Sequence, residues 1–256
     1  MTKGEVIIVG LGPGGPETVT PEADAATRRA TDLVGYAPYL ARVPEQDGQA
    51  RHSSNNREEL SRARHALTLA LAGKTVAVVS SGDGGVFAMA STVFEAIEAG
   101  QDEGFGGVEV TVVPGITAML AAAARVGAPL GHDFCAISLS DNLKPWEIVV
   151  QRLEAAAAAD FVIALYNPVS KARPWQLKAA FDLVRKHRAG DTPVIFASAV
   201  TRPDEEIEVR SLSDADSGPA DMRTVVIIGS SATRTIQRDG GRPYVYTPRR
   251  VPEPVA

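Results

Sequence analysis

Short runs of aliphatic and β-branched residues alternate with helical patterns along the first half of the chain. We expect strands at Val6–Val9, Leu33–Tyr36, Thr75–Ser80 and Val108–Val113. Stretches with apolar residues on one helical face predict helices at Pro21–Thr31, Arg57–Ala72 and Ala88–Ala99. Regular alternation of strand and helix is typical of a mostly parallel sheet with helices on both faces.

The same pattern starts again after Val113-Pro114-Gly115. In this second half we expect strands at Phe134–Leu139, Phe161–Tyr166, Pro193–Ala199 and Thr224–Gly229, with helices at Trp146–Ala158 and Trp175–His187. Glu206–Arg210 alternates polar and apolar residues, which predicts an antiparallel edge strand. We therefore predict two α/β domains, residues 1–113 and 114–247, with mostly parallel sheets and the deepest cleft between the domains. Three prolines in residues 248–256 predict a disordered tail.

Two of the predicted strands end abruptly in small, permissive residues. Thr75–Ser80 is followed by Ser81-Gly82-Asp83, and Val108–Val113 leads into Pro114-Gly115-Ile116-Thr117-Ala118. Turns of this kind present bare backbone N–H and C=O groups at the carboxyl edge of a sheet, where ligands bind in α/β folds. The sequence therefore predicts a small-molecule site at Gly82-Asp83 and Thr117-Ala118.

A third turn, Gly10–Gly15, has the glycine spacing of a dinucleotide-binding loop. Taken alone, it favours an oxidoreductase that uses NAD or FAD. However, the best helix start is Thr20-Pro21, which leaves a long loop where the helix should face a pyrophosphate. The second strand ends in Gly35-Tyr36, without the acidic residue that binds ribose hydroxyls. A tight turn with close backbone packing is the other interpretation of these glycines.

Charge and cysteine content narrow the class of protein. The 256 residues carry a formal net charge of −5, which gives no reason to expect a nucleic acid or an anionic membrane as a partner. Cys135 is the only cysteine, so neither an intramolecular disulfide nor a cysteine-based zinc site can form. No apolar run approaches the roughly 20 residues that span a bilayer, and Met1–Glu5 enters a strand without an apolar signal. We expect a soluble, cytoplasmic protein.

Three motifs occur in a characteristic order: Gly10-Leu11-Gly12-Pro13-Gly14, Ser81-Gly82-Asp83 and Pro114-Gly115-Ile116-Thr117-Ala118. In this order and spacing they resemble the tetrapyrrole methylases, the S-adenosylmethionine (SAM) enzymes of the cobalamin and sirohaem pathways. Three further segments are Gly35-Tyr36, Ser138–Asp141 with Pro145-Trp146, and Leu165–Lys171 with Arg173. They are similar to the branch that methylates C17 of precorrin-3B and contracts the ring to precorrin-4. The resemblance covers about Gly4 to Ile236.

This resemblance implies the tetrapyrrole methylase fold (class III SAM methyltransferases), a SAM cofactor in the cleft between the domains, a precorrin substrate and a homodimer. The cofactor contacts that it implies are Pro13, Ser81, Gly82, Asp83, Val86, Thr117, Ala118, Tyr166, Asn167, Val200 and Thr224. Of these, Pro13 is expected to lie nearer to the macrocycle than to the cofactor.

The residue types suit this chemistry. Gly82 and Ala118 let a ligand approach the backbone, and Asp83 can accept hydrogen bonds from a ribose or an ammonium group, or from its own turn. Methyl transfer needs alignment, whereas ring contraction needs a base that removes a hydroxyl proton. The candidate catalytic bases are Asp83, Asp141 and His52. Of these, His52 is expected to lie in a polar loop. No pair of histidines has metal-ligand spacing, so no metal site is expected.

A precorrin carries many carboxylates, so basic residues are expected at its site. Basic residues in suitable segments are Lys171, Arg173, Arg57 and Lys144, and the other interpretation of each one is a solvated surface charge. Three alternatives remain open: another corrin-pathway methylase, including the cobalt counterpart of the C17 step; an NAD-linked oxidoreductase; and a non-catalytic tetrapyrrole carrier. The oxidoreductase and the carrier can be distinguished by what the purified protein retains: SAM, S-adenosylhomocysteine (SAH) or a nicotinamide chromophore.

Overall fold

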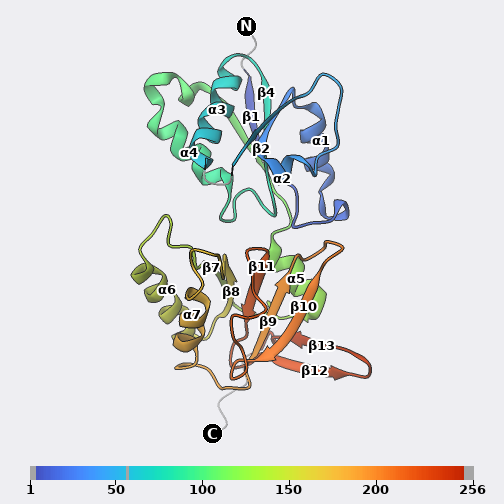
Figure 1. Cartoon of the computed structure of the whole chain (residues 1–256), viewed down its shortest axis with the longest axis vertical. Helices are drawn as coiled ribbons and strands as arrows, with labels where there is room; N and C mark the ends of the chain where they lie inside the picture. Colours follow the sequence, from blue (N-terminus) through green and yellow to red (C-terminus); the bar gives the residue numbers. More distant parts are fainter. Residues whose placement is uncertain (1–3, 56–57, 251–256) are drawn as a thin grey trace. The chain divides into compact units, whose positions relative to one another are not determined.

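The computed structural model describes residues 4–55 and 58–250 and forms two compact units that divide between Thr117 and Ala118 (Figure 1). Arg57 and residues 251–256, most of the expected disordered tail, lie outside the described residues. The expected α/β class is confirmed, because each unit is built around a five-stranded sheet that helices cover.

The sheet of the first unit is entirely parallel, as predicted. Its strand order is β3-β2-β4-β1-β5. The strands are β1 (Glu5–Gly10), β2 (Asp32–Tyr36), β3 (Ala50–Ser54), β4 (Thr75–Ser80) and β5 (Glu109–Val113). The prediction of a polar loop around His52 is wrong, because Ala50–Ser54 pairs with β2 as an edge strand. An edge strand that is half exposed lacks the apolar run by which the other strands are recognised.

Helices cover both faces of this sheet. They are α1 (Pro21–Arg29), α2 (Ala37–Leu40), α3 (Glu59–Leu71) and α4 (Met89–Ala99), with short 3₁₀ turns at η1 (Pro16–Thr18), η2 (Gln101–Glu103) and η3 (Phe105–Gly107). Alternate residues of β1 point to opposite faces: Val6 and Ile8 pack in the cluster under α3 and α4, while Ile7 and Val9 pack in the cluster under α1 and α2. Figure 1 shows α3 and α4 on one side of the sheet and α1 and α2 on the other. Burial on both faces explains why the central strands are continuously apolar.

The sheet of the second unit differs from the expected mostly parallel arrangement. Its order is β10-β9-β11-β8-β7, and only β7 and β8 pair in parallel. The strands are β7 (Phe134–Ser138), β8 (Val162–Tyr166), β9 (Pro193–Ser198), β10 (Glu206–Ser211) and β11 (Thr224–Ile228). The connection from β9 to β10 is too short for a crossover helix, so β10 returns antiparallel, as its alternating pattern predicts. β11 then inserts between β8 and β9, which the sequence pattern does not indicate.

Helices and a small second sheet cover the two faces of this mixed sheet. α6 (Trp146–Ala158) and α7 (Gln176–Val184) pack on one face, and α5 (Ala118–Val126) packs on the other (Figure 1). The small sheet contains β6 (Gly127–Ala128), β12 (Arg234–Arg238) and β13 (Gly241–Tyr246). All five residues of β12 are exposed, so the strand has no burial periodicity from which to predict it. Within residues 4–55 and 58–250, no helix is long and apolar enough to span a membrane.

The mixed sheet still gathers the predicted site residues at one edge. Because β8 and β9 are both antiparallel to β11, their carboxyl ends lie where β11 begins. Thr224, the first residue of β11, is in register with Ser198, the last residue of β9. The end of β7 lies at the same edge, since Ser138 is in register with Tyr166.

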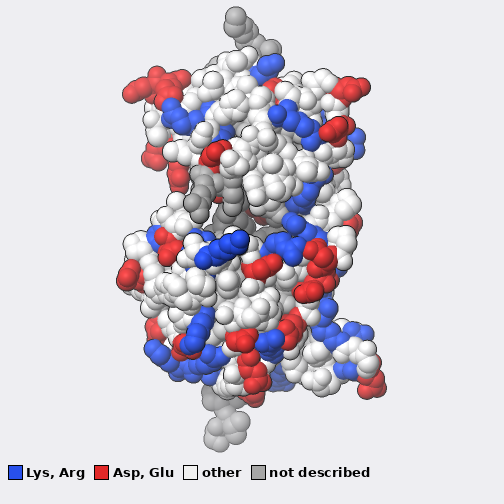
Figure 2. Space-filling view, viewed as in Figure 1, with Lys and Arg blue, Asp and Glu red and all other residues white. Residues whose placement is uncertain are grey.

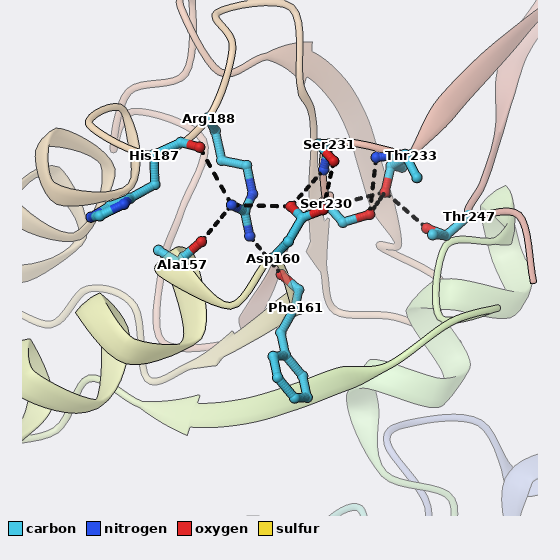
Figure 3. A network of polar contacts seen from close by, with 10 residues as sticks. Ala157, Asp160, Phe161, His187, Arg188, Ser230, Ser231, Thr233 and Thr247 are labelled. Atoms are coloured by element: carbon cyan, nitrogen blue, oxygen red, sulfur yellow. Dashed lines mark hydrogen bonds and ion pairs between the residues drawn. The ribbon is translucent and has the colours of Figure 1, made fainter. Parts of the chain in front are cut away.

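A polar network around the buried Arg188 side chain ties together the opposite edge of this sheet (Figure 3). The Arg188 guanidinium donates to the carbonyls of Ala157 (2.5 Å) and Phe161 (3.2 Å) and lies 3.1 Å from Asp160 Oδ1. Asp160 in turn accepts from the backbone N–H of Ser231 at 2.8 Å. Burial lowers the pKa of Arg188, and the Asp160 charge opposes that shift. The network fixes this edge through α6, α7 and the end of β11.

Candidate functional site

Three strand ends of the first unit meet in backbone contact. Gly12 and Gly82 exchange two hydrogen bonds, from Gly12 N to Gly82 O (3.0 Å) and from Gly82 N to Gly12 O (2.8 Å). A Cβ on Gly115 would lie 2.2 Å from the Gly82 carbonyl oxygen, and one on Gly10 would lie 2.7 Å from the Gly115 nitrogen. Only glycine allows this approach, so the glycines hold the loops after β1, β4 and β5 together.

Asp83 fixes the same junction with both carboxylate oxygens. Its Oδ1 accepts from the Gly85 N–H at 2.7 Å, which closes the turn. Its Oδ2 accepts from the Gly115 N–H at 2.9 Å, which connects the loop after β4 to the loop after β5. An ionised carboxylate has about four acceptor positions, so these two bonds leave room for a ligand donor. The turn role and the ligand role of Asp83 are therefore compatible.

Arg42, which the sequence gives no reason to select, joins two of these loops. Its guanidinium donates from Nη2 to the carbonyls of Leu11 (2.6 Å) and Gly12 (2.9 Å), and from Nη1 to Ser81 Oγ (3.2 Å). Arg42 follows α2 along the chain and is partly buried. One side chain thus holds the loop after β1 against the loop after β4.

The remaining predicted residues of the first unit lie in these loops. Pro13 is buried in the loop after β1, and Val86 is partly buried in the loop before α4. Thr117 is 5% exposed and immediately precedes α5. Ser81, Gly82 and Asp83 are therefore brought together with Pro13 and Val86 at one sheet edge.

His52 is not brought to that edge. Its Nε2 lies 2.8 Å from Oδ1 of Asp32, the first residue of β2, and its ring centroid is 4.8 Å from that of His65 on α3. Burial pushes the pKa of Asp32 upward, but hydrogen bonds from His52 and Thr31 and the Lys74 charge outweigh it, so the net shift is downward. His52 thus pairs at the amino end of the sheet, whereas Asp83 lies at the carboxyl end.

The second unit presents its own set of predicted residues at one edge. The Tyr166 hydroxyl accepts from the Met119 N–H at 3.0 Å, which ties β8 to the start of α5 beside Ala118. Asn167 Nδ2 donates to Ser138 Oγ at 2.9 Å, which ties the ends of β8 and β7. These bonds fix the segment that carries the candidate ligand groups.

Val200 and Thr224 lie at the same edge, where β9 ends and β11 begins. Val200 is buried, and the Thr224 hydroxyl donates to Asp221 Oδ1 at 2.8 Å. On either side of Val200, Ala199 and Thr201 have φ angles of 47° and 67°. Both predicted side chains are buried. This segment can therefore contact a ligand only through its backbone groups or after the loop rearranges.

Backbone strain marks these edges independently of the motifs. Positive φ angles at non-glycine residues are uncommon, and for a β-branched residue such as Thr201 they are outliers. Within residues 4–55 and 58–250, such residues are Phe87, Asp160, Asn167, Ala199 and Thr201. All except Asp160 lie in loops that contain predicted site residues. Strain of this kind is retained at ligand-binding sites, where the surrounding structure enforces it.

Asp141 belongs to a polar cluster between the loops after β7 and β8. Its Oδ2 accepts from Gln176 Nε2 at 3.3 Å, and its Oδ1 lies 3.7 Å from Arg173 Nη1. Arg173 Nη1 also donates to Asn142 Oδ1 at 2.6 Å. The pKa of nearby Lys144 is lowered, first by burial and then by the Arg152 charge. Among the residues that the structure describes, no group of three or more His, Cys, Asp or Glu can hold a metal ion.

The chain resembles known proteins both in sequence and in fold. Residues 5–216 match the family described as Tetrapyrrole (Corrin/Porphyrin) Methylases. The chain is 57% identical to a precorrin-3B C(17)-methyltransferase of Sinorhizobium sp. over 96% of both chains. It is 49% identical to the cobalamin biosynthesis protein CobIJ of Mycobacterium tuberculosis over 99% of its own length, but it spans about half (49%) of that protein. The crystal structure of the methyltransferase CobJ superposes with a TM-score of 0.90 at 54% identity, covering 96% of this chain and all of that one.

Proposed function

The chain belongs to the tetrapyrrole (corrin/porphyrin) methylase family, and from that premise we propose that it transfers a methyl group from SAM to C17 of precorrin-3B and contracts the ring to precorrin-4. The observation that carries this proposal is the 57% identity, over 96% of both chains, to a methyltransferase of that name. The activity class is methyl transfer, and its place is cobalamin biosynthesis.

We further propose SAM as the cofactor. Its contacts are Pro13, Ser81, Gly82, Asp83, Val86 and Thr117 from the first unit, and Ala118, Tyr166, Asn167, Val200 and Thr224 from the second. The residues suit this group in two ways. Asp83 keeps free acceptor positions for a ribose or an ammonium group beside its two backbone bonds. Gly82 is partly exposed and has no side chain that would keep a nucleoside away from the loop after β4.

The chain's own groups mainly have to hold and align two reactants. When bound, SAM supplies a methyl group on a sulfonium cation. The loops that Asp83 and Arg42 lock keep the contacts to such a ligand in a fixed geometry, and alignment of this kind contributes up to roughly 7–11 kcal/mol. Ring contraction additionally requires a carboxylate or imidazole that takes a hydroxyl proton. Asp83 and Asp141 are the proposed candidates, because His52 bonds to Asp32 at the amino end of the first sheet.

A binding experiment tests the proposal directly. Calorimetry with SAH is expected to show one site per chain. NADH and FAD are expected to leave the melting temperature unchanged at saturating concentration, because α1 begins at Pro21 and not inside the Gly10–Gly15 turn. A clear thermal shift with either dinucleotide, and none with SAH, would support the oxidoreductase instead.

The substrate is tested by product mass. Incubation with SAM and the trimethylated precursor, metal-free in one sample and cobalt-loaded in the other, is expected to yield a methylated, ring-contracted product from the metal-free macrocycle. Turnover of only the cobalt-loaded macrocycle would identify the cobalt counterpart, and SAH binding without any turnover would favour a carrier.

Arg42 provides a second prediction. Arg42→Lys keeps the charge but cannot donate to Leu11, Gly12 and Ser81 at once. SAH affinity is expected to fall about tenfold, because hydrogen bonds from charged groups each contribute about 1.5–3 kcal/mol. Arg185→Lys is the matched control: Arg185 also donates to backbone carbonyls, those of Leu212 (3.0 Å) and Ala215 (2.5 Å), away from the loops that carry the predicted site. Equal losses of affinity in both variants would indicate general destabilisation.

We also propose that the protein is a cytoplasmic homodimer. Each chain of this dimer would have two α/β domains, residues 1–113 and 114–247. Sedimentation of the full chain over a range of concentrations tests the dimer.

A further inference from the structure

The two tryptophans of the chain form one pair in the second unit. Trp146 begins α6, Trp175 precedes α7, and their ring centroids are 4.9 Å apart at 76°. Trp146 packs against the hydrophobic core, whereas Trp175 is 47% exposed. The exposed ring is therefore held edge-to-face by a ring that the core fixes. A large, rigid and half-exposed aromatic side chain is typical of a binding surface.

Apolar and basic residues accompany Trp175 at this edge. The bond between Arg173 and Asn142 joins the loops after β8 and β7, and Leu143, next to Asn142, is 92% exposed. The two loops and the first turn of α6 contain three basic residues, Lys144, Lys171 and Arg173, and two acidic ones, Asp141 and Glu147. This segment is therefore net positive, although the whole chain has a net charge of −5. Figure 2 shows lysine and arginine side chains along the end of this unit where these loops lie.

The same segment contains polar atoms whose hydrogen bonding is incomplete. Ser170 Oγ, Arg173 Nε and Gln176 Oε1 are buried and have no hydrogen-bond partner among the described residues. Gln176 is 1% exposed. Most buried polar atoms in native proteins are paired, so three unpaired atoms in one short segment require a reason. A loop that repacks around a ligand provides one.

We infer that Trp175, Leu143 and Arg173 form the surface that receives the tetrapyrrole ring. This inference rests on the proposed function. A tetrapyrrole is a broad, largely apolar ring system with carboxylates around its rim. The Trp175 ring and Leu143 offer apolar area to the ring system. Arg173, whose side chain is 12% exposed beside Asp141, pairs with a rim carboxylate when this loop repacks. The surface lies beyond the carboxyl ends of β7 and β8, next to Asn167, which is where ligands bind in folds of this class.

Intrinsic tryptophan fluorescence arises from this pair alone, because the chain has no other tryptophan. Titration of the full-length protein with uroporphyrin, a tetrapyrrole with acidic side chains only, is expected to quench the tryptophan fluorescence with saturation. N-acetyltryptophanamide at equal absorbance corrects for light absorbed by the porphyrin.

Variants test the individual contacts. Affinities are measured from the porphyrin's own fluorescence. Trp175→Ala is expected to weaken uroporphyrin binding about tenfold, and Trp175→Phe, which keeps a flat ring, less than about threefold. Arg173→Gln is expected to weaken binding and to flatten its salt dependence. Tyr244→Ala is the control: Tyr244 is 48% exposed on β13, away from these loops, and its loss is expected to leave the affinity unchanged.

The outcomes separate this inference from the proposed function. SAH calorimetry on the same samples is expected to give the parent affinity in every variant. Parent affinity for uroporphyrin in Trp175→Ala, with SAH binding intact, would overturn the inference and leave the proposed function standing. Failure of the parent protein to bind SAH would count against the proposed function. A change of oligomeric state in Trp175→Ala, without loss of uroporphyrin binding, would assign the surface to a second copy of the chain and overturn the inference.

Discussion

Replacing Gly115 with alanine is expected to slow methyl transfer by about 10²-fold and to lower the free energy of unfolding by about 1–3 kcal/mol. The added Cβ would lie 2.2 Å from the Gly82 carbonyl oxygen and 2.7 Å from the Gly10 carbonyl group, which are backbone atoms that cannot swing away. The loops after β1, β4 and β5 must therefore separate. Overpacking typically costs about 1–3 kcal/mol, and a displacement of about 1 Å in a positioning site can cost roughly 10²-fold in rate.

Single-turnover methyl transfer and urea unfolding measure the two effects. Gly107→Ala is the matched control in the same unit, because a Cβ at Gly107 meets no atom within 4 Å. It is expected to match the parent protein in both assays. Normal methyl transfer by Gly115→Ala would show that the contact of the three strand ends is not needed for the reaction.

The second large effect is expected on ring contraction. Replacing the carboxylate that takes the hydroxyl proton is expected to slow contraction by about 10²–10⁴-fold. Asp83→Asn and Asp141→Asn are the informative variants. Asp141→Asn is expected to retain SAH affinity, since its amide oxygen can still accept from Gln176. Asp83→Asn is expected to lose affinity as well, because an amide can satisfy only one of the two N–H groups that the carboxylate accepts from.

His52→Gln completes this set as a control. His52 bonds to Asp32 at the amino end of the first sheet, away from the loops at the carboxyl end. The His52→Gln variant is therefore expected to contract the ring at the rate of the parent protein. Rapid mixing with product masses resolved over time separates methylation from contraction. If both asparagine variants contract the ring as fast as the parent, the proton acceptor is another group.

Much of the fold could be predicted because burial leaves a periodic trace in sequence. The central strands of both sheets are covered on both faces and read as apolar runs, and α1 begins at Pro21 after the Thr20 cap, as predicted. β3 and β12 leave no such trace, because both face solvent over much of their length. The position of β11 between β8 and β9 depends on contacts distant in sequence, so local pattern could not predict it.

The candidate site divides in the same way. Glycine-rich strand ends indicate that backbones approach closely. In the structure, Gly12, Gly82 and Gly115 do lie together at one junction. Arg42 carries no comparable signal, because nothing local distinguishes an arginine that clamps carbonyls from one that faces water. The positive φ angle of Thr201 is likewise a property of the folded chain alone.

The polar network of Figure 3 has a mechanical consequence for the end of the chain. Thr247, directly after β13, is 3% exposed and donates its hydroxyl proton to the Pro129 carbonyl at 2.6 Å, while its backbone N–H donates to Ala128. A load applied beyond residue 250, by a surface tether or a fused domain, would reach these bonds before it reached the β12–β13 hairpin. These bonds are therefore expected to break first under such a load, and tension would reach the sheet that carries Tyr166 and Asn167 only afterwards.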